Sequence, residues 1–121
     1  MLNLTPTIRI FLCVTAVDLR KSFDGLSALV EQALGTDPLC GHWFVFRNKA
    51  GDRLKVLAWQ EDGFAIWYKR LEEGTFRFPT PAGEGPPRLE IRAAELAMLL
   101  DGVVLEKVQR RKRFHRPATA K

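Results

Sequence analysis

The sequence lacks any apolar run that approaches the roughly 20 residues a helix needs to cross a bilayer. It also lacks a charged start followed by an apolar stretch and a cleavage site, the arrangement of a secretory signal. These absences argue against an integral membrane protein and against a secreted one. We therefore expect a cytoplasmic protein that makes no membrane contact.

Cysteine and histidine are both scarce, with two residues of each. Cys13 lies in an apolar run and Cys40 stands beside a glycine, so we expect two reduced thiols and no disulfide. Cys40 and His42 form an isolated pair without the paired spacing of a structural zinc site. Cys13 and His115 could join this pair to supply four metal ligands, but only in principle. We expect neither a metal nor a cofactor.

Catalytic motifs are missing as well. No GxxxxGK[ST] phosphate-binding loop occurs, so nothing in the sequence supports nucleotide hydrolysis. Ser22 and Ser27 lack the nucleophile-elbow sequence of a Ser-His-Asp site. Asp52, Glu61 and Asp62 stand in turns, where carboxylates usually cap or solubilise the chain. We expect a protein that is not an enzyme, and metal-dependent DNA cleavage by the pure protein would overturn this.

Positive charge is concentrated at one end of the chain. The net charge is +5, yet no acid follows Glu106. Seven basic residues lie in 107–121, so the first 106 residues carry a net charge of −2. We predict one α+β domain over residues 1–106 and a basic, disordered tail over residues 107–121. Such an arm attracts nucleic-acid phosphate by counterion release, and the alternative is that the tail is merely solvated.

Hydrophobic periodicity predicts the order of the elements. Apolar positions between Asp18, a candidate N-cap, and Gly35, a candidate stop, predict an amphipathic helix. Turn-rich segments separate three further apolar runs and predict an antiparallel β-meander. The fold class expected is an α+β meander sheet of about four to six strands packed on that helix. Strands are predicted at 8–14, 42–48, 53–60, 64–70, 75–78 and 88–91, and a short last helix at 93–100.

Alternation along the meander sorts its side chains into two predicted faces. The core face would pack on the first helix and comprises Phe44, Phe46, Leu54, Val56, Ala58, Phe64, Ile66, Phe76 and Phe78. The other face combines all three tryptophans with basic residues and no acid; it comprises Trp43, Val45, Arg47, Arg53, Lys55, Leu57, Trp59, Trp67, Lys69 and Arg77.

An aromatic and basic sheet face suits nucleic acid, because rings stack on bases and cations hold phosphates. The predicted nucleic-acid contacts are Arg47, Arg53, Lys55, Lys69 and Arg77 on the sheet and Arg110, Arg111, Lys112 and Arg113 in the tail. Trp43, Trp59 and Trp67 are predicted to stack on bases or to meet a partner. The alternative is that the tryptophans pack against the last helix or a partner subunit, with Lys and Arg stems covering them.

Two segments of the sequence resemble one family. They are GHWFVFRNKAGDRLKVLAWQEDGFAIWYKRLEEG, from Gly41 to Gly74, and VDLRKSFDGLSALVEQALG, from Val17 to Gly35, which is followed by Asp37-Pro38. Both are similar to the TnpB-type, Orf2-like accessory proteins of the insertion sequences of class sixty-six. The resemblance implies a part in bacterial DNA transposition, assisting it rather than cleaving DNA. Implied partners are the transposase and the companion accessory protein of the same element.

The polar residues Asp18, Arg20, Lys21 and Asp24 form the most recognisable short motif of the resemblance. Each has a structural explanation as a helix cap, a dipole partner or an ion pair. The alternative is that Arg20 and Lys21 extend a basic patch for DNA or the transposase. Two functions follow: a non-catalytic accessory protein that binds DNA, or an adaptor that docks to the transposase through its tryptophans without DNA affinity.

Overall fold

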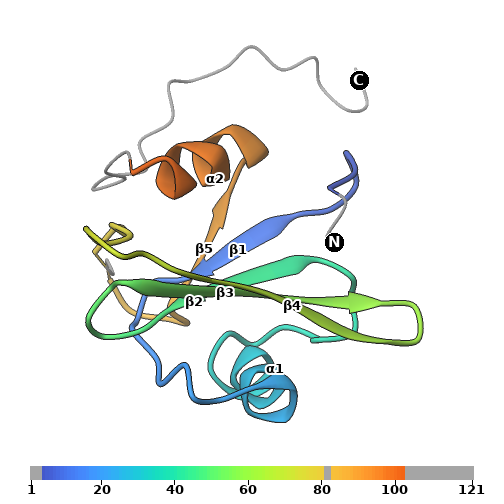
Figure 1. Ribbon diagram of the computed structural model, residues 1–121. Coiled ribbons are helices and arrows are strands. Elements are labelled where there is room, and N and C mark those ends of the chain that lie inside the picture. Colours follow the sequence, from blue (N-terminus) through green and yellow to red (C-terminus); the bar gives the residue numbers. More distant parts are fainter. Residues whose placement is uncertain (1–3, 81–82, 103–121) are drawn as a thin grey trace.

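The sheet and two helices form an α+β fold in the computed structural model, which describes residues 4–80 and 83–102 (Figure 1). The elements in chain order are β1 (Ile10–Cys13), α1 (Phe23–Gln32), β2 (Trp43–Arg47), β3 (Arg53–Gln60), β4 (Gly63–Arg70), β5 (Arg88–Ile91) and α2 (Ala93–Leu100). The predicted α+β class is confirmed. The predicted tail at 107–121 lies outside the described residues.

The sheet has five strands in the order β4-β3-β2-β1-β5. Only β2, β3 and β4 form the predicted antiparallel meander. β1 runs parallel to β2, because the connection between them crosses over through α1. β5 then returns antiparallel to the outer side of β1. The expectation of a meander throughout was therefore wrong for β1 and β5.

Two helices cover the two faces of the sheet, α1 on one side and α2 on the other (Figure 1). On the α1 side the buried core includes Leu26, Val30, Phe44 and Phe46. On the α2 side it includes Val45, Val56, Leu96 and Leu99. The sheet is thus buried on both faces, which explains why the strands carry so few positions for a polar surface.

The first helix begins at Phe23 rather than near Asp18. The Asp18 carboxylate instead accepts the backbone N–H of Arg20, and the Lys21 N–H donates to the Asp18 carbonyl oxygen. These local bonds make a turn that competes with helix. The predicted stop is correct, since Gly35 adopts a φ of 63°, in the left-handed region.

The predicted strand at 75–78 is absent from the structure, which gives these four residues no regular conformation. The Phe76 N–H donates to the Gly51 carbonyl oxygen at 2.7 Å. This bond holds residues 75–78, here called the strap, against the β2–β3 loop. Phe76 itself is buried on the α2 side of the sheet. The aromatic residues that suggested a strand therefore serve to cover the core, not to extend the ladder.

Candidate nucleic-acid interface

The predicted aromatic and basic face is divided between the two sides of the sheet. Trp43 pairs with Ala58 and Phe44 with Leu57, so the residues of β3 take the opposite faces from those predicted. Each hairpin pairs an even-numbered residue with an odd-numbered one, and this exchange reverses the assignment. Phe44, Phe46, Phe64 and Ile66 do face α1 as predicted, but Leu54, Val56, Ala58, Phe76 and Phe78 face α2.

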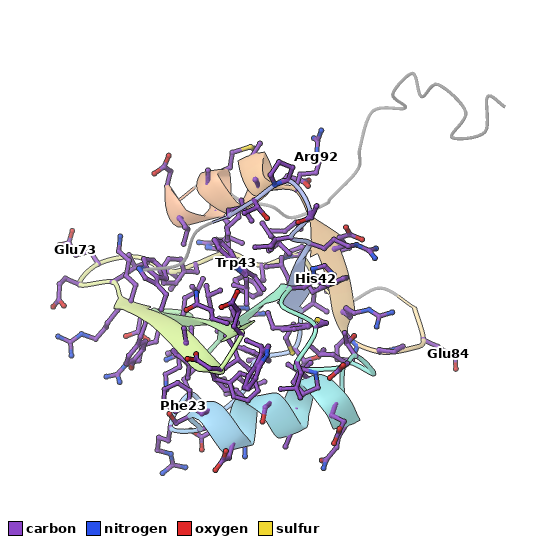
Figure 2. All side chains as sticks on the ribbon, turned by 90° about the vertical axis from the view of Figure 1, so that its right-hand side faces the viewer. Phe23, His42, Trp43, Glu73, Glu84 and Arg92 are labelled. Carbon is purple, nitrogen blue, oxygen red and sulfur yellow. The ribbon has the colours of Figure 1, made fainter. Side chains whose placement is uncertain are left out.

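The three tryptophans do not share a surface. Trp43 is only 9% exposed and lies on the α2 side, where Trp67 packs against the same cluster. This cluster also contains Leu96 and Leu99 of α2. Trp59 belongs to the other face, with its ring edge-to-face against Phe64 at a centroid distance of 5.1 Å. Figure 2 shows Trp43 within the body of the molecule.

Lys55 is a buried structural residue in the folded domain. It is 8% exposed, and its Nζ donates to the carbonyl oxygens of Leu19 at 2.7 Å and Lys21 at 2.9 Å. The ammonium also lies 4.8 Å from the centre of the Tyr68 ring. Because its donors are directed at the backbone, Lys55 fixes the segment before α1 to the sheet and does not present its charge to a ligand.

Arg47 is half-buried at the end of β2. Its guanidinium lies over the Phe78 ring at 5.1 Å, and Nη2 donates to the Val14 carbonyl oxygen at 3.4 Å. Its Nε is buried and has no hydrogen-bond partner within the described residues. Most of this side chain is therefore committed to packing, and Arg47 is a poor candidate for a phosphate contact.

The remaining predicted cations on the domain are exposed, although on different faces. Arg53 lies on the α1 side of the sheet and Lys69 on the α2 side, while Arg77 belongs to the strap beside the β2–β3 loop. The predicted tail contacts Arg110, Arg111, Lys112 and Arg113 lie outside the described residues. What the three exposed residues share is not a face but one end of the sheet.

That end carries a cluster of cations, here called the basic edge. It is the end at which β2 finishes, β3 begins and β4 finishes, and the register sets Arg53 directly opposite Arg70. The basic edge comprises Arg20, Lys21, Lys49, Arg53, Lys69, Arg70 and Arg77. In Figure 2, Phe23 at the start of α1 and Glu73 after β4 lie on the same side, and Glu84 lies opposite.

Several cations of the basic edge have no acidic partner. Arg20 pairs with Asp18 and Arg70 with Glu72, both at the surface. No salt bridge within the described residues involves the other five, which are Lys21, Lys49, Arg53, Lys69 and Arg77. At the far end of the β3–β4 hairpin the turn residues are the acids Glu61 and Asp62. The turn of the hairpin is therefore acidic, while its open end carries Arg53, Lys69 and Arg70 together with Glu72.

Within the basic edge lies an open depression of about 520 Å³, here called the polar depression. Its lining comes from the turn before α1, the β2–β3 loop and β4, and comprises Asp18, Leu19, Arg20, Asn48, Asp52, Arg53 and Tyr68. The Val17 N–H donates to the Arg47 carbonyl oxygen at 3.0 Å, which joins the first two of these segments. The turn before α1 and the β2–β3 loop, which are far apart in the sequence, thus meet at the polar depression.

Asp18 and Arg20 form a surface pair at the rim of the polar depression. Arg20 donates Nε to Oδ1 at 3.0 Å and Nη2 to Oδ2 at 2.6 Å, and its backbone N–H also reaches Oδ1 at 2.9 Å. Side-chain hydrogen bonds from Arg20, followed by its backbone N–H, lower the pKa of Asp18 to about 2. The pair keeps this carboxylate ionised and holds the guanidinium in one direction.

The Asp18 pair predicts a measurable titration. A carboxyl whose pKa is lower in the folded state stabilises the fold above its unfolded pKa, and that contribution is lost as the pH falls toward about 2. Side-chain carboxyl NMR should find the Asp18 midpoint near 2 in the native protein. In an Arg20→Ala variant the midpoint should move up toward the ordinary aspartate value of about 3.9. An unchanged midpoint would show that Arg20 is not the cause.

Tyr68 was not predicted from the sequence, although it is the only tyrosine in the chain. Its side of β4 could have been inferred from alternation with Phe64 and Ile66, and its two basic neighbours follow it directly. It is 48% exposed, and its hydroxyl accepts a hydrogen bond from Arg53 Nη1 at 2.9 Å. An exposed ring therefore stands among the guanidinium groups of the basic edge.

Metal and thiol chemistry find little support in the described part of the chain. No group of three or more His, Cys, Asp and Glu side chains there could hold a metal ion. His42 Nδ1 accepts the backbone N–H of Arg9 at 2.9 Å, which is a structural use. Both cysteines are free, and burial raises the pKa of Cys13. Over residues 4–80 and 83–102, neither helix has the length and apolar character to cross a membrane.

Comparison with known proteins agrees with the family motifs of the sequence. The family described as IS66 Orf2 like protein matches residues 8–110. The uncharacterized protein y4jC of Sinorhizobium fredii is 38% identical over 111 residues, covering 92% of each chain. A second protein of that organism, y4hO, is 33% identical over 103 residues, covering 85% of this chain and 87% of its own. No solved structure matches. The chain belongs to the IS66 Orf2-like family, the accessory proteins of insertion-sequence transposition.

Proposed function

We propose that this protein is a non-catalytic accessory protein that binds DNA during transposition through its basic edge and its basic C-terminal segment. The observation that carries the proposal is the group of exposed cations at one end of the sheet that lack acidic partners among the described residues. Such cations bind phosphate with a gain from released counterions. The transposase and the companion accessory protein of the element remain the expected protein partners.

The pairing of Arg53 with Arg70 supports a ligand of opposite charge. Like charges directly opposite one another on adjacent strands destabilise a sheet. Arg70 is offset by Glu72, but Arg53 donates to a neutral hydroxyl instead. A phosphate bound between the Arg53 and Arg70 side chains would supply the missing negative charge. The repulsion between Arg53 and Arg70, which destabilises the sheet, would then favour the binding of phosphate.

The set of proposed contacts changes from that predicted by sequence. Arg53, Lys69 and Arg77 are retained, together with the tail cations. Lys55 is set aside because its ammonium bonds to two backbone carbonyls, and Arg47 because its guanidinium packs over Phe78 and bonds to the Val14 carbonyl. The tryptophan-based adaptor loses its common surface, because Trp59 lies on the opposite face of the sheet from the other two. Lys49, Arg70, Arg20 and Lys21 join the proposed DNA contacts.

A triple neutralisation of the basic edge tests the proposal. The variant Lys49→Gln, Lys69→Gln, Arg77→Gln removes three exposed cations outside the polar depression. Duplex binding, followed by fluorescence anisotropy, should weaken roughly ten-fold or more at low salt. The log-log salt slope should fall by about 0.9 for each phosphate that the variant no longer neutralises. The same titration on a chain truncated after Val108 measures the share contributed by the tail.

The matched control places the same change in net charge elsewhere. Ala94→Glu, Ala97→Glu, Met98→Glu adds three negative charges to the exposed side of α2. The control should bind DNA nearly as well as the native protein. Equal losses in the two variants would assign the effect to overall charge, and native protein that binds neither duplex nor single-stranded DNA would overturn the proposal.

A further inference from the structure

The polar depression combines an exposed aromatic ring with two exposed guanidinium groups. Tyr68, Arg20 and Arg53 all line it. Rings of this kind stack on nucleobases, and guanidinium groups bind phosphate. We propose that the polar depression holds one unstacked nucleotide of DNA, with its base on Tyr68 and its phosphate between Arg20 and Arg53. This inference rests on the proposed function and names the form of DNA that the basic edge prefers.

The Tyr68 ring is held in place on one side and open on the other. Arg53 bonds its hydroxyl at 2.9 Å, and the Lys55 ammonium lies 4.8 Å from its centre. Lys55 is its partner in β3, whereas no described strand lies on the outer side of β4. A ring that is already ordered loses little conformational freedom when a ligand stacks on it. Tyr68 is 48% exposed and lines the polar depression, so a base that enters the depression can reach the ring.

The two arginines retain unused donors for a phosphate. Arg20 directs Nε and Nη2 at Asp18, and no bond within the described chain involves its Nη1. Arg53 uses Nη1 for Tyr68, and its Nε and Nη2 make no bond to described groups. Asp18 and Asp52 also line the depression, but each is bonded, to Arg20 and to Asn48. The charge of Asp18 is therefore offset by Arg20, whereas the bond from the neutral Asn48 amide leaves the charge of Asp52 in place.

Lys55 acts as a positioning residue for this pocket. Its Nζ bonds to the carbonyl oxygens of Leu19 and Lys21, the residues on either side of Arg20. The same ammonium lies against Tyr68. One buried side chain therefore fixes the distance between the phosphate-binding segment and the stacking ring. This arrangement is formed before any ligand arrives.

Stacking on Tyr68 requires a base whose face is uncovered. In a regular duplex both faces of each base are covered by its neighbours, so only a single-stranded or extruded base can lie on the ring. The cations of the basic edge alone would not distinguish duplex from single-stranded DNA. The polar depression supplies that distinction, and it predicts preference for unpaired DNA such as arises when strands are separated or distorted.

Fluorine NMR on the full chain tests the pocket directly. Because Tyr68 is the only tyrosine, 3-fluorotyrosine labelling gives a single reporter. An unpaired oligonucleotide should shift this resonance, and a duplex of the same sequence should shift it much less. Tyr68→Leu should weaken single-strand binding about ten-fold or more, while Tyr68→Phe keeps the ring and most of the affinity. Duplex binding should stay within about two-fold in both variants.

Each outcome of this experiment decides between the claims. The nucleotide pocket is overturned if Tyr68→Leu binds single-stranded DNA as well as the native protein does and if the fluorotyrosine resonance of the native protein does not move. Salt-sensitive duplex binding is left intact by that result. A resonance that moves equally with duplex also overturns it, because the depression would then contact only the backbone. Native protein that binds neither single-stranded nor duplex DNA overturns the proposed function itself. Circular dichroism of the Tyr68→Leu variant confirms that its fold is retained.

Discussion

Replacing Phe44 with alanine is expected to lower the free energy of unfolding by about 3–5 kcal/mol, the usual cost of truncating a buried phenylalanine. Phe44 is fully buried in β2, the middle strand of the five. It pairs with Phe11 on one side and Leu57 on the other. Its ring stacks on Phe11 at a centroid distance of 5.7 Å. No neighbouring element can move in to fill the space without disturbing both strands.

Urea unfolding followed by circular dichroism measures this loss. A small domain has only about 5–15 kcal/mol of stability in total, so the Phe44 variant should be close to unfolding in water. Phe23→Ala is the matched control, since Phe23 is 44% exposed at the first position of α1. It should cost less than about 1 kcal/mol. Equal losses in the two variants would contradict the packing described for β2.

Lys55→Met is expected to lower the free energy of unfolding by about 2 kcal/mol. Hydrogen bonds to a charged group contribute about 1.5–3 kcal/mol each, and Lys55 makes two to carbonyl oxygens. Part of that gain is offset, because methionine does not need to bury a charge. Methionine matches the lysine side chain up to the ammonium nitrogen, so the measured loss reports mainly on the ammonium.

Lys69→Met provides the control for Lys55. Lys69 lies on the next strand, has the same side chain and is exposed. Its substitution should change the free energy of unfolding by less than about 0.5 kcal/mol. A Lys55 variant as stable as the Lys69 variant would show that desolvation of the ammonium cancels its two bonds. Hydrogen exchange of the amides of residues 19–21 would then show whether this segment is still held.

The positions of most elements could be predicted from periodicity within a single segment. The last helix at 93–100 and the strand at 88–91 were placed correctly, as were the three strands of the meander within one or two residues. These patterns are local, since alternation or helical spacing is set by the burial of one segment. The start of α1 was not predicted, because the bonds that Asp18 makes in a turn and in a cap look alike in sequence.

The relation between segments could not be predicted in the same way. Which face of β3 meets which face of β2 depends on the number of residues in the turn and on the pairing across it. The pairing of Phe46 with Lys55 reversed the predicted faces of β3. The same reversal removed Lys55 from the candidate site and brought Arg53 beside Tyr68. The basic edge forms because the ends of several β-strands meet. Alternation within one β-strand gives no information about which strand ends lie together.

The position of β1 in the sheet has a consequence for the order in which the domain can assemble. β1 is the first described strand in chain order, but its neighbours are β2 and β5, and β5 is the last described strand. On the ribosome, the apolar stretch Ile10–Cys13 has no pairing partner until residues 43–47 have emerged, and one edge stays uncovered until residues 88–91 follow. Local contacts form sooner than distant ones. The β2–β3–β4 hairpins, which also build the basic edge, can therefore form first, and the N-terminal strand is incorporated afterwards.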